Sequence, residues 1–89
     1  MASAPAFDWD DANISHIARH GVTREEVEQA FASNRVLFMA VQRRGGEERV
    51  LCAGLTGMGR AIQFVYTMRR GRIRIITAHT AKKRLRDKL

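Results

Sequence analysis

The chain has a single cysteine and a single proline. One cysteine cannot form an intramolecular disulfide or a zinc cluster, and Cys52 lies in an apolar run where a small buried thiol is expected. This cysteine usage is typical of a reducing compartment, so we expect a cytoplasmic protein. No run approaches the roughly 18 apolar residues of a membrane span, and residues 1–6 lack the basic and apolar parts of a secretory signal. The sequence thus predicts neither a membrane segment nor a leader.

Motifs for cofactors and metals are absent as well. The chain has no G-x-G-x-x-G after a strand, no Walker loop and no H-E-x-x-H. His16 and His20 stand four residues apart, a spacing that can chelate a metal, but no third ligand follows at a defined spacing. A solvated or RNA-facing pair is therefore favoured over a metal site. We expect no cofactor and no metal.

Acidic residues are scarce, since nine Asp and Glu stand against 16 Lys and Arg, for a net charge of +7 over 89 residues. Residues 1–41 carry three basic and six acidic side chains (net −3), whereas residues 42–89 carry thirteen and three (net +10). Such a basic half predicts a polyanionic partner, nucleic acid first and an acidic protein second. The length predicts one domain over residues 7–89, behind a loose tail at residues 1–6.

Two helices are expected in the first part of the chain. A carboxylate cap at Asp10 and a glycine stop at Gly21 predict a helix over residues 11–20. The S/T-x-x-E capping box that begins at Thr23 is followed by an apolar stripe at helical spacing. It predicts a second helix over residues 24–33.

Runs of β-branched and aromatic residues, punctuated by glycine, follow these helices. They predict four strands joined by tight turns, and hence an antiparallel meander, over residues 36–41, 49–55, 62–67 and 72–77. Residues 7–9 add a fifth strand in one interpretation, and the basic tail over residues 80–89 is expected to be helical. The fold class is therefore α+β, with two N-terminal helices packed on a four- to five-stranded antiparallel sheet and a short basic C-terminal helix.

Arginines recur on the predicted strands. Arg72 and Arg74 alternate with isoleucines, which directs both guanidinium groups to one face of the sheet. Arg49, at the start of the second strand, extends this cationic surface. Guanidinium groups clamp phosphates, and Tyr66 offers a ring for base stacking or a hydroxyl for phosphate contact. Arginines on an open sheet face are equally explained by solvation. The RNA-binding candidates are Arg19, Tyr66, Arg69, Arg70, Lys82 and Lys83.

Two histidines supply groups that exchange protons near neutral pH, as RNA cleavage through the ribose 2′-hydroxyl requires. They are His20 and His79, and each also has a purely structural interpretation. Glu48 is a rival base, with an alternative role as the exposed partner of Arg49 or as a strand-end carboxylate. Arginines and proton-transfer groups without a metal motif indicate a small metal-independent ribonuclease. The alternative is a non-catalytic module that binds RNA or an acidic protein.

Short segments spread over nearly the whole chain carry a family resemblance. They are residues 7–10 (FDWD), 19–23 (RHGVT), 46–49 (GEER), 65–67 (VYT) and 72–78 (RIRIITA). In their order and spacing the chain resembles the BrnT toxins of bacterial type II toxin–antitoxin modules. The resemblance implies a RelE-like fold, an endoribonuclease activity that inhibits translation, and neutralisation by an antitoxin whose ribbon-helix-helix domain binds the operon DNA. A dimer, or a heterotetramer with the antitoxin, fits the same resemblance.

The chain departs from the family pattern at four positions. Lys, Asn, Lys and Arg are usual in the family where this chain has Ala12, His16, Arg19 and His79. The last of these changes replaces a permanent cation with a side chain that can also donate a proton.

The candidate residues define an expected mechanism. Arg49, Arg72 and Arg74 are expected to hold the scissile phosphate and to stabilise the charge that grows in the transition state. His79 or His20 is expected to protonate the leaving 5′-oxygen or to accept the 2′-hydroxyl proton. The product is then a 2′,3′-cyclic phosphate, formed without a metal.

Overall fold

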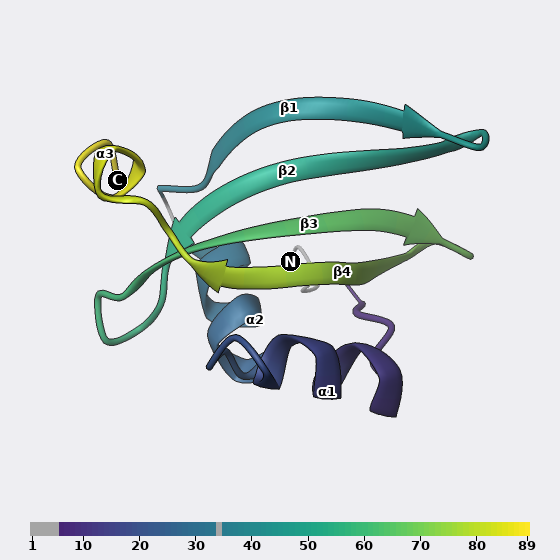
Figure 1. Ribbon diagram of the computed structural model, residues 1–89, viewed down its shortest axis with the longest axis horizontal. Helices are drawn as coiled ribbons and strands as arrows, with labels where there is room; N and C mark the ends of the chain where they lie inside the picture. Colours follow the sequence, from purple (N-terminus) through teal and green to yellow (C-terminus); the bar gives the residue numbers. More distant parts are fainter. Residues whose placement is uncertain (1–5, 34) are drawn as a thin grey trace, which may run out of the picture.

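A computed structural model describes residues 6–33 and 35–89. Its elements, in chain order, are α1 (Asp11–Ala18), α2 (Arg24–Ala32), β1 (Leu37–Arg44), β2 (Glu47–Leu55), β3 (Ala61–Arg69), β4 (Arg72–Thr80) and α3 (Lys83–Arg86). The strands form one antiparallel sheet in the order β1-β2-β3-β4, and α1 and α2 lie together on one of its faces (Figure 1). The predicted α+β architecture of two N-terminal helices, a four-stranded sheet and a short C-terminal helix is confirmed.

Both N-terminal helices begin at the predicted caps. The Asp10 carboxylate accepts a hydrogen bond from the backbone N–H of Asn13, and the Asn13 side-chain oxygen accepts one from the Asp10 backbone N–H. Thr23 and Glu26 form the same reciprocal box at α2. Both helices end earlier than the expected residues 20 and 33. After α1, the backbone N–H groups of His20 and Gly21 donate to carbonyls three residues back, which forms turns in place of α-helix. α2 ends because the backbone of Ser33 is extended.

All four strands differ in extent from the expected residues 36–41, 49–55, 62–67 and 72–77. The two hairpin turns, at residues 45–46 and 70–71, have positive φ at both positions, which matches the right-handed twist of the flanking strands. Backbone pairing therefore runs through the polar residues beside each turn, up to Arg44 opposite Glu47 and Arg69 opposite Arg72. Hydrophobic patterning underestimates such strand ends because pairing needs no apolar side chain.

The predicted helix over residues 80–89 is wrong in extent, since only Lys83–Arg86 are helical. The backbone N–H of Ala81 instead donates to the Ala61 carbonyl at 2.9 Å, which continues the sheet contact beyond β4. The fifth strand predicted at residues 7–9 is also absent from the described part of the chain, where Phe7 forms only an isolated parallel bridge with Ile73.

The predicted loose tail, residues 1–6, lies outside the described residues except for Ala6. The Ala6 carbonyl accepts a hydrogen bond from the backbone N–H of Ile73 at 2.9 Å, so this residue is attached to the sheet. Within the described ranges, no helix has the length and apolar character needed to cross a membrane.

The core lies between the sheet and the two helices. Cys52, Phe64 and Ala78 are opposite one another on β2, β3 and β4, and all three are buried. Burial raises the pKa of the Cys52 thiol to about 11, as expected for an unreactive core cysteine. Gly54 allows close packing of α2 on β2, because a Cβ atom there would lie 2.5 Å from the Ala30 carbonyl oxygen.

The β4 edge of the sheet is covered by other parts of the chain. On β4, the carbonyls of Ile73 and Ile75 accept hydrogen bonds from the Asp8 backbone N–H at 2.8 Å and from the Asn13 side chain at 3.3 Å. The N-terminal segment and α1 therefore cover this edge, and α1 runs along β4. The C-terminal end of α1 consequently lies near the C-terminal end of β4 (Figure 1).

Candidate ribonuclease site

The candidate residues fall into two groups at opposite ends of β4. Arg69, Arg70 and Arg72 surround the β3–β4 turn. His79 lies near the other end of β4, beside α1. Arg74 and His79 are five residues apart, which is about 16 Å along a strand at ~3.3 Å per residue. The structure therefore does not bring the expected arginines and histidines together around one phosphate.

Three imidazoles form a cluster on α1 and β4. The ring centroids of His16 and His20 are 5.4 Å apart, and those of His20 and His79 are 6.3 Å apart. The sequence drew attention to His16 and His20 through their spacing, but their proximity to His79 depends on how α1 packs on β4. Two neighbouring imidazoles place two groups of the kind used in general acid–base catalysis side by side.

The histidine rings have different hydrogen-bond partners. His79 Nδ1 lies 3.0 Å from the Thr80 carbonyl oxygen, which can only accept, so Nδ1 carries the hydrogen and Nε2 holds the lone pair in the neutral ring. His16 Nε2 lies 3.2 Å from Thr77 Oγ1. Among residues 6–33 and 35–89, no group of three or more His, Cys, Asp or Glu side chains is arranged to hold a metal ion.

Arg74 is occupied by carboxylates from the N-terminal segment. Its Nη1 lies 3.0 Å from Asp10 Oδ2 and 3.6 Å from Asp8 Oδ2, and the side chain is only 14% exposed. The hydrogen bond with Asp10 raises the pKa of Arg74, and the same bond, with the Asn13 backbone N–H, lowers the pKa of Asp10. The expected position of Arg74 on a cationic sheet surface is therefore wrong, because Asp8 and Asp10 of the N-terminal segment neutralise its charge.

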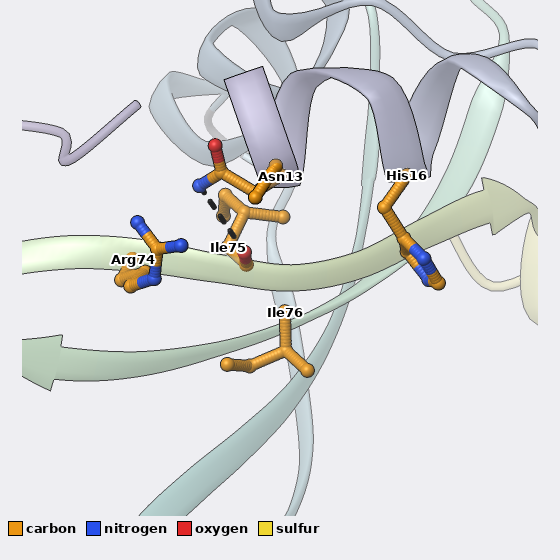
Figure 2. A pocket seen from close by; sticks show the side chains of 6 residues that line it. Asn13, His16, Arg74, Ile75 and Ile76 are labelled. Carbon is orange, nitrogen blue, oxygen red and sulfur yellow. Dashed lines mark hydrogen bonds between the residues drawn. The ribbon is translucent and has the colours of Figure 1, made fainter. Parts of the chain in front are cut away.

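Arg74 borders a shallow pocket between α1 and β4. Figure 2 shows Asn13 and His16 on the helix side of this pocket and Ile75 and Ile76 on the strand side. Asn13 is buried and donates to the carbonyls of both Asp8 and Ile75, so it anchors the start of α1 to the strand. The pocket thus connects the arginine to the histidine cluster along the surface.

The β3–β4 turn forms a second, larger hollow, lined by Asp8, Arg69, Arg70 and Arg72. Among the described residues, none of these three arginines forms an ion pair within 4.0 Å. Unpaired guanidinium groups around a hollow suit a phosphate. This hollow has the chemistry of an anion-binding site but contains no histidine.

Arg49 is partly buried, and among the described residues its Nε has no hydrogen-bond partner. Its Nη2 lies 3.9 Å from Glu47 Oε2, whereas the carboxylate of Glu48 pairs with Arg43 at 3.1 Å. Of the two structural alternatives for Glu48, the pairing with Arg49 is therefore wrong, and Glu48 is a carboxylate near the start of β2. Because the Arg49 Nε is buried, its N–H is not exposed to a ligand in this conformation.

Tyr66, a candidate for RNA contact, is partly buried. Its ring packs edge-on against Phe31, with centroids 5.5 Å apart, at the rim of the core. Burial, with a smaller contribution from Cys52, raises the pKa of its hydroxyl. Three other predicted RNA contacts are exposed, and they are Arg19, Lys82 and Lys83.

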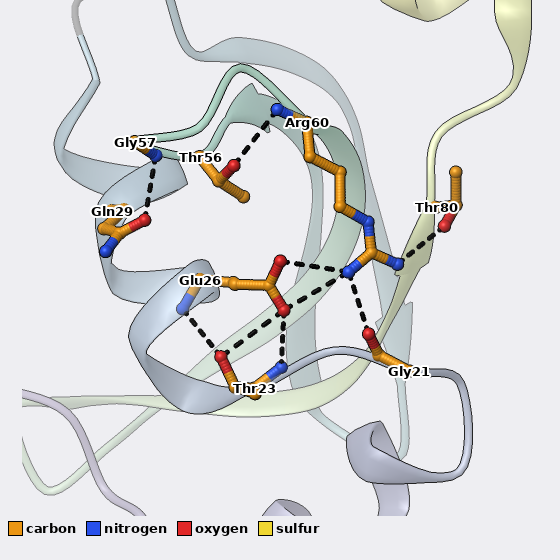
Figure 3. A network of polar contacts seen from close by, with 8 residues as sticks. All are labelled: Gly21, Thr23, Glu26, Gln29, Thr56, Gly57, Arg60 and Thr80. Atoms are coloured by element: carbon orange, nitrogen blue, oxygen red, sulfur yellow. Dashed lines mark hydrogen bonds and ion pairs between the residues drawn. The ribbon is translucent and has the colours of Figure 1, made fainter.

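Arg60 is a residue that the sequence did not single out. Figure 3 shows its guanidinium among acceptors from three separate segments. Partial burial opposes ionisation of Glu26, but hydrogen bonds from Thr23 and Arg60 outweigh it and lower the pKa of this carboxyl. The Thr23–Glu26 capping box is visible in the sequence because its residues are three positions apart. Arg60 lies 34 residues from Glu26, so residue spacing could not predict their contact.

The lowered pKa of Glu26 makes the stability of the fold depend on pH in the acidic range. A carboxyl with a depressed pKa stabilises the fold above its ordinary value, here 4.5, and this contribution is lost as pH falls through the folded-state value. We expect Glu26→Gln to weaken the fold at pH 7 and to flatten the decline in stability below about pH 4.5. Urea unfolding between pH 3 and pH 7 measures this.

Glu25→Gln is the matched control, because Glu25 is exposed and, among the described residues, pairs only with Arg24, at 3.6 Å. It should reproduce the acid decline of the unmodified protein. An equally steep decline in Glu26→Gln contradicts the assignment.

Residues 9–84 match the sequence model of a protein family, the ribonuclease toxin BrnT of type II toxin–antitoxin systems. This interval extends from the residue before the α1 cap into α3, so it includes both groups of candidate residues. Comparison with curated proteins gives no significant match. The family implies an antitoxin as partner. The family resemblance expected from the sequence is thus confirmed, and the chain belongs to the BrnT family of ribonuclease toxins.

Proposed function

We propose that this protein is a metal-independent endoribonuclease toxin that cleaves RNA through the ribose 2′-hydroxyl and so inhibits translation. The observation that carries the proposal is the proximity of His20 and His79, whose ring centroids are 6.3 Å apart. Cleavage by this route needs one group that accepts a proton and one that donates a proton, and two neighbouring histidines supply both. The BrnT membership of the chain supports the RNA substrate.

His79 is the base in this proposal and His20 is the acid. In its neutral form, His79 holds its lone pair on Nε2, since Nδ1 donates to Thr80, and Nε2 accepts the 2′-hydroxyl proton. The 2′-oxygen then bonds to phosphorus as the bond to the 5′-oxygen breaks. Protonated His20 gives its proton to that leaving oxygen. The products are a 2′,3′-cyclic phosphate and a 5′-hydroxyl.

The arginines contact flanking phosphates rather than the scissile one. Arg72 is seven residues from His79, or about 23 Å along the strand, a span of several nucleotides. The unpaired Arg69, Arg70 and Arg72 are suited to bind RNA at one end of β4. At the other end, the exposed Lys82 and Lys83 follow His79 along the chain. We assign Arg74 to attachment of the N-terminal segment.

The remaining parts of the proposal follow from the family. A RelE-like fold is compatible with the helix and strand order, and an antitoxin with a ribbon-helix-helix domain is expected to neutralise the toxin and to bind the operon DNA. The basic half of the chain favours an acidic surface on this antitoxin. We expect the antitoxin and RNA to compete for the same arginines.

RNA cleavage in excess EDTA tests the proposal. The purified protein is incubated with end-labelled RNA, and we expect the same rate with and without chelator and products that end in a 2′,3′-cyclic phosphate. A matched RNA with a 2′-deoxynucleotide at the cleavage site should stay intact. Loss of cleavage on chelation contradicts the mechanism. RNA binding without any cleavage favours the non-catalytic alternative, in which the arginine hollow binds RNA alone.

A further inference from the structure

Arg60 is held in place by the turn that precedes β3. Its backbone N–H donates to Thr56 Oγ1 at 3.1 Å, and its carbonyl accepts from the Thr56 N–H at 2.8 Å. The same turn is attached to α2, because the Gly57 N–H donates to Gln29 Oε1 at 2.8 Å (Figure 3). The base of the Arg60 side chain is therefore fixed relative to both the sheet and α2.

The Arg60 guanidinium joins two segments that each follow a histidine. Nη1 donates to the Gly21 carbonyl at 2.8 Å, and Nη2 donates to Thr80 Oγ1 at 2.8 Å. Gly21 is the residue after His20, and Thr80 is the residue after His79. In the described part of the chain, no other side chain hydrogen-bonds to both segments.

Glu26 completes the arrangement. Its carboxylate oxygens lie 3.0 and 3.2 Å from Arg60 Nη1, and its own position is fixed by the capping box at the start of α2. The side chains of Arg60 and Glu26 are both partly buried, at 33% and 25% exposure. The ion pair thus orients the guanidinium so that its two terminal nitrogens point to different segments.

From this geometry we propose that Arg60 is a positioning residue that sets the distance between His20 and His79. The planar guanidinium presents several N–H donors in a fixed fork, whereas the single ammonium of lysine cannot reach acceptors on both sides. The catalytic consequence rests on the proposed ribonuclease function. The structural consequence, which is the proximity of the two imidazoles, does not.

Two variants test this role by two measurements. Arg60→Lys keeps the charge but loses the fork, and Thr80→Val removes only the acceptor of Nη2 at an exposed position. In both variants we expect the nuclear Overhauser contacts between the His20 and His79 ring protons to weaken, while core amide signals persist. For RNA cleavage, we expect kcat to fall by about 100-fold in Arg60→Lys, with KM little changed. Thr80→Val should show a smaller fall.

Arg24→Lys is the matched control, since Arg24 is an exposed arginine on α2 that pairs with Glu25. Both readouts should equal those of the unmodified protein. Unchanged ring contacts and unchanged kcat in Arg60→Lys overturn the proposal, and if that variant does not fold, unchanged values in Thr80→Val overturn it. Absence of RNA cleavage by the unmodified protein refutes the ribonuclease proposal alone, because the ring contacts still report on Arg60.

Discussion

Replacing His79 by glutamine is expected to lower the rate of RNA cleavage by roughly 100- to 10,000-fold. Glutamine keeps a similar size and polarity but cannot accept the 2′-hydroxyl proton. The exposed His79 supports no core packing, so the variant should fold normally. RNA binding should persist, because the arginines about 23 Å away along β4 are unchanged. Single-turnover cleavage rates and RNA binding measured by fluorescence anisotropy separate these two effects.

The same substitution at His20 should cost a comparable factor. The double variant should be little worse than either single variant, because the two groups act in one step. His16→Gln is the control, since His16 belongs to the same cluster but has no proton-transfer role in the proposed mechanism. Rates equal to the unmodified protein in His79→Gln and His20→Gln contradict the acid–base assignment, as does a loss of RNA binding that accounts for the whole effect.

Gly54→Ala is expected to destabilise the fold by about 3 kcal/mol, the upper part of the range for overpacking. The added Cβ would lie 2.5 Å from the carbonyl oxygen of Ala30 and 3.2 Å from its side chain. The close atom belongs to the backbone of α2 and cannot rotate away, so the helix must shift on the sheet. Urea unfolding at neutral pH measures the loss.

Gly57→Ala provides the matched control. A Cβ there would lie 3.1 Å from Gln29 Oε1, the end of a flexible side chain that can move. We expect a clearly smaller loss of stability than in Gly54→Ala. Equal losses in the two variants show that the close approach of α2 to β2 is not the cause.

Local signals predicted the starts of both long helices and the order of the strands. The capping boxes at Asp10 and Thr23 depend on residues three positions apart, so they are visible in the sequence. The C-terminal helix is shorter than expected because the contact of Ala81 with Ala61 competes with helix formation at the start of the tail. That contact joins residues distant in the chain, and periodicity does not report it.

The site was predictable by residue type but not by arrangement. The sequence offers histidines and arginines as candidate groups, yet alternation along a strand could not reveal that Arg74 meets Asp10, 64 residues away. It also could not reveal the distance between arginines and histidines along β4. The bond between Arg60 and Thr80 is equally non-local, so spacing gave no signal for it.

The contact of Arg74 with Asp8 and Asp10 also affects how binding of RNA responds to salt. These carboxylates act as built-in counterions, so an RNA phosphate near Arg74 displaces few mobile ions from it. Arg69, Arg70 and Arg72, in contrast, have no such partner among the described residues. We therefore expect the slope of log K against log salt concentration to reflect these arginines together with Lys82 and Lys83, and to be smaller than the excess of +10 in residues 42–89 suggests.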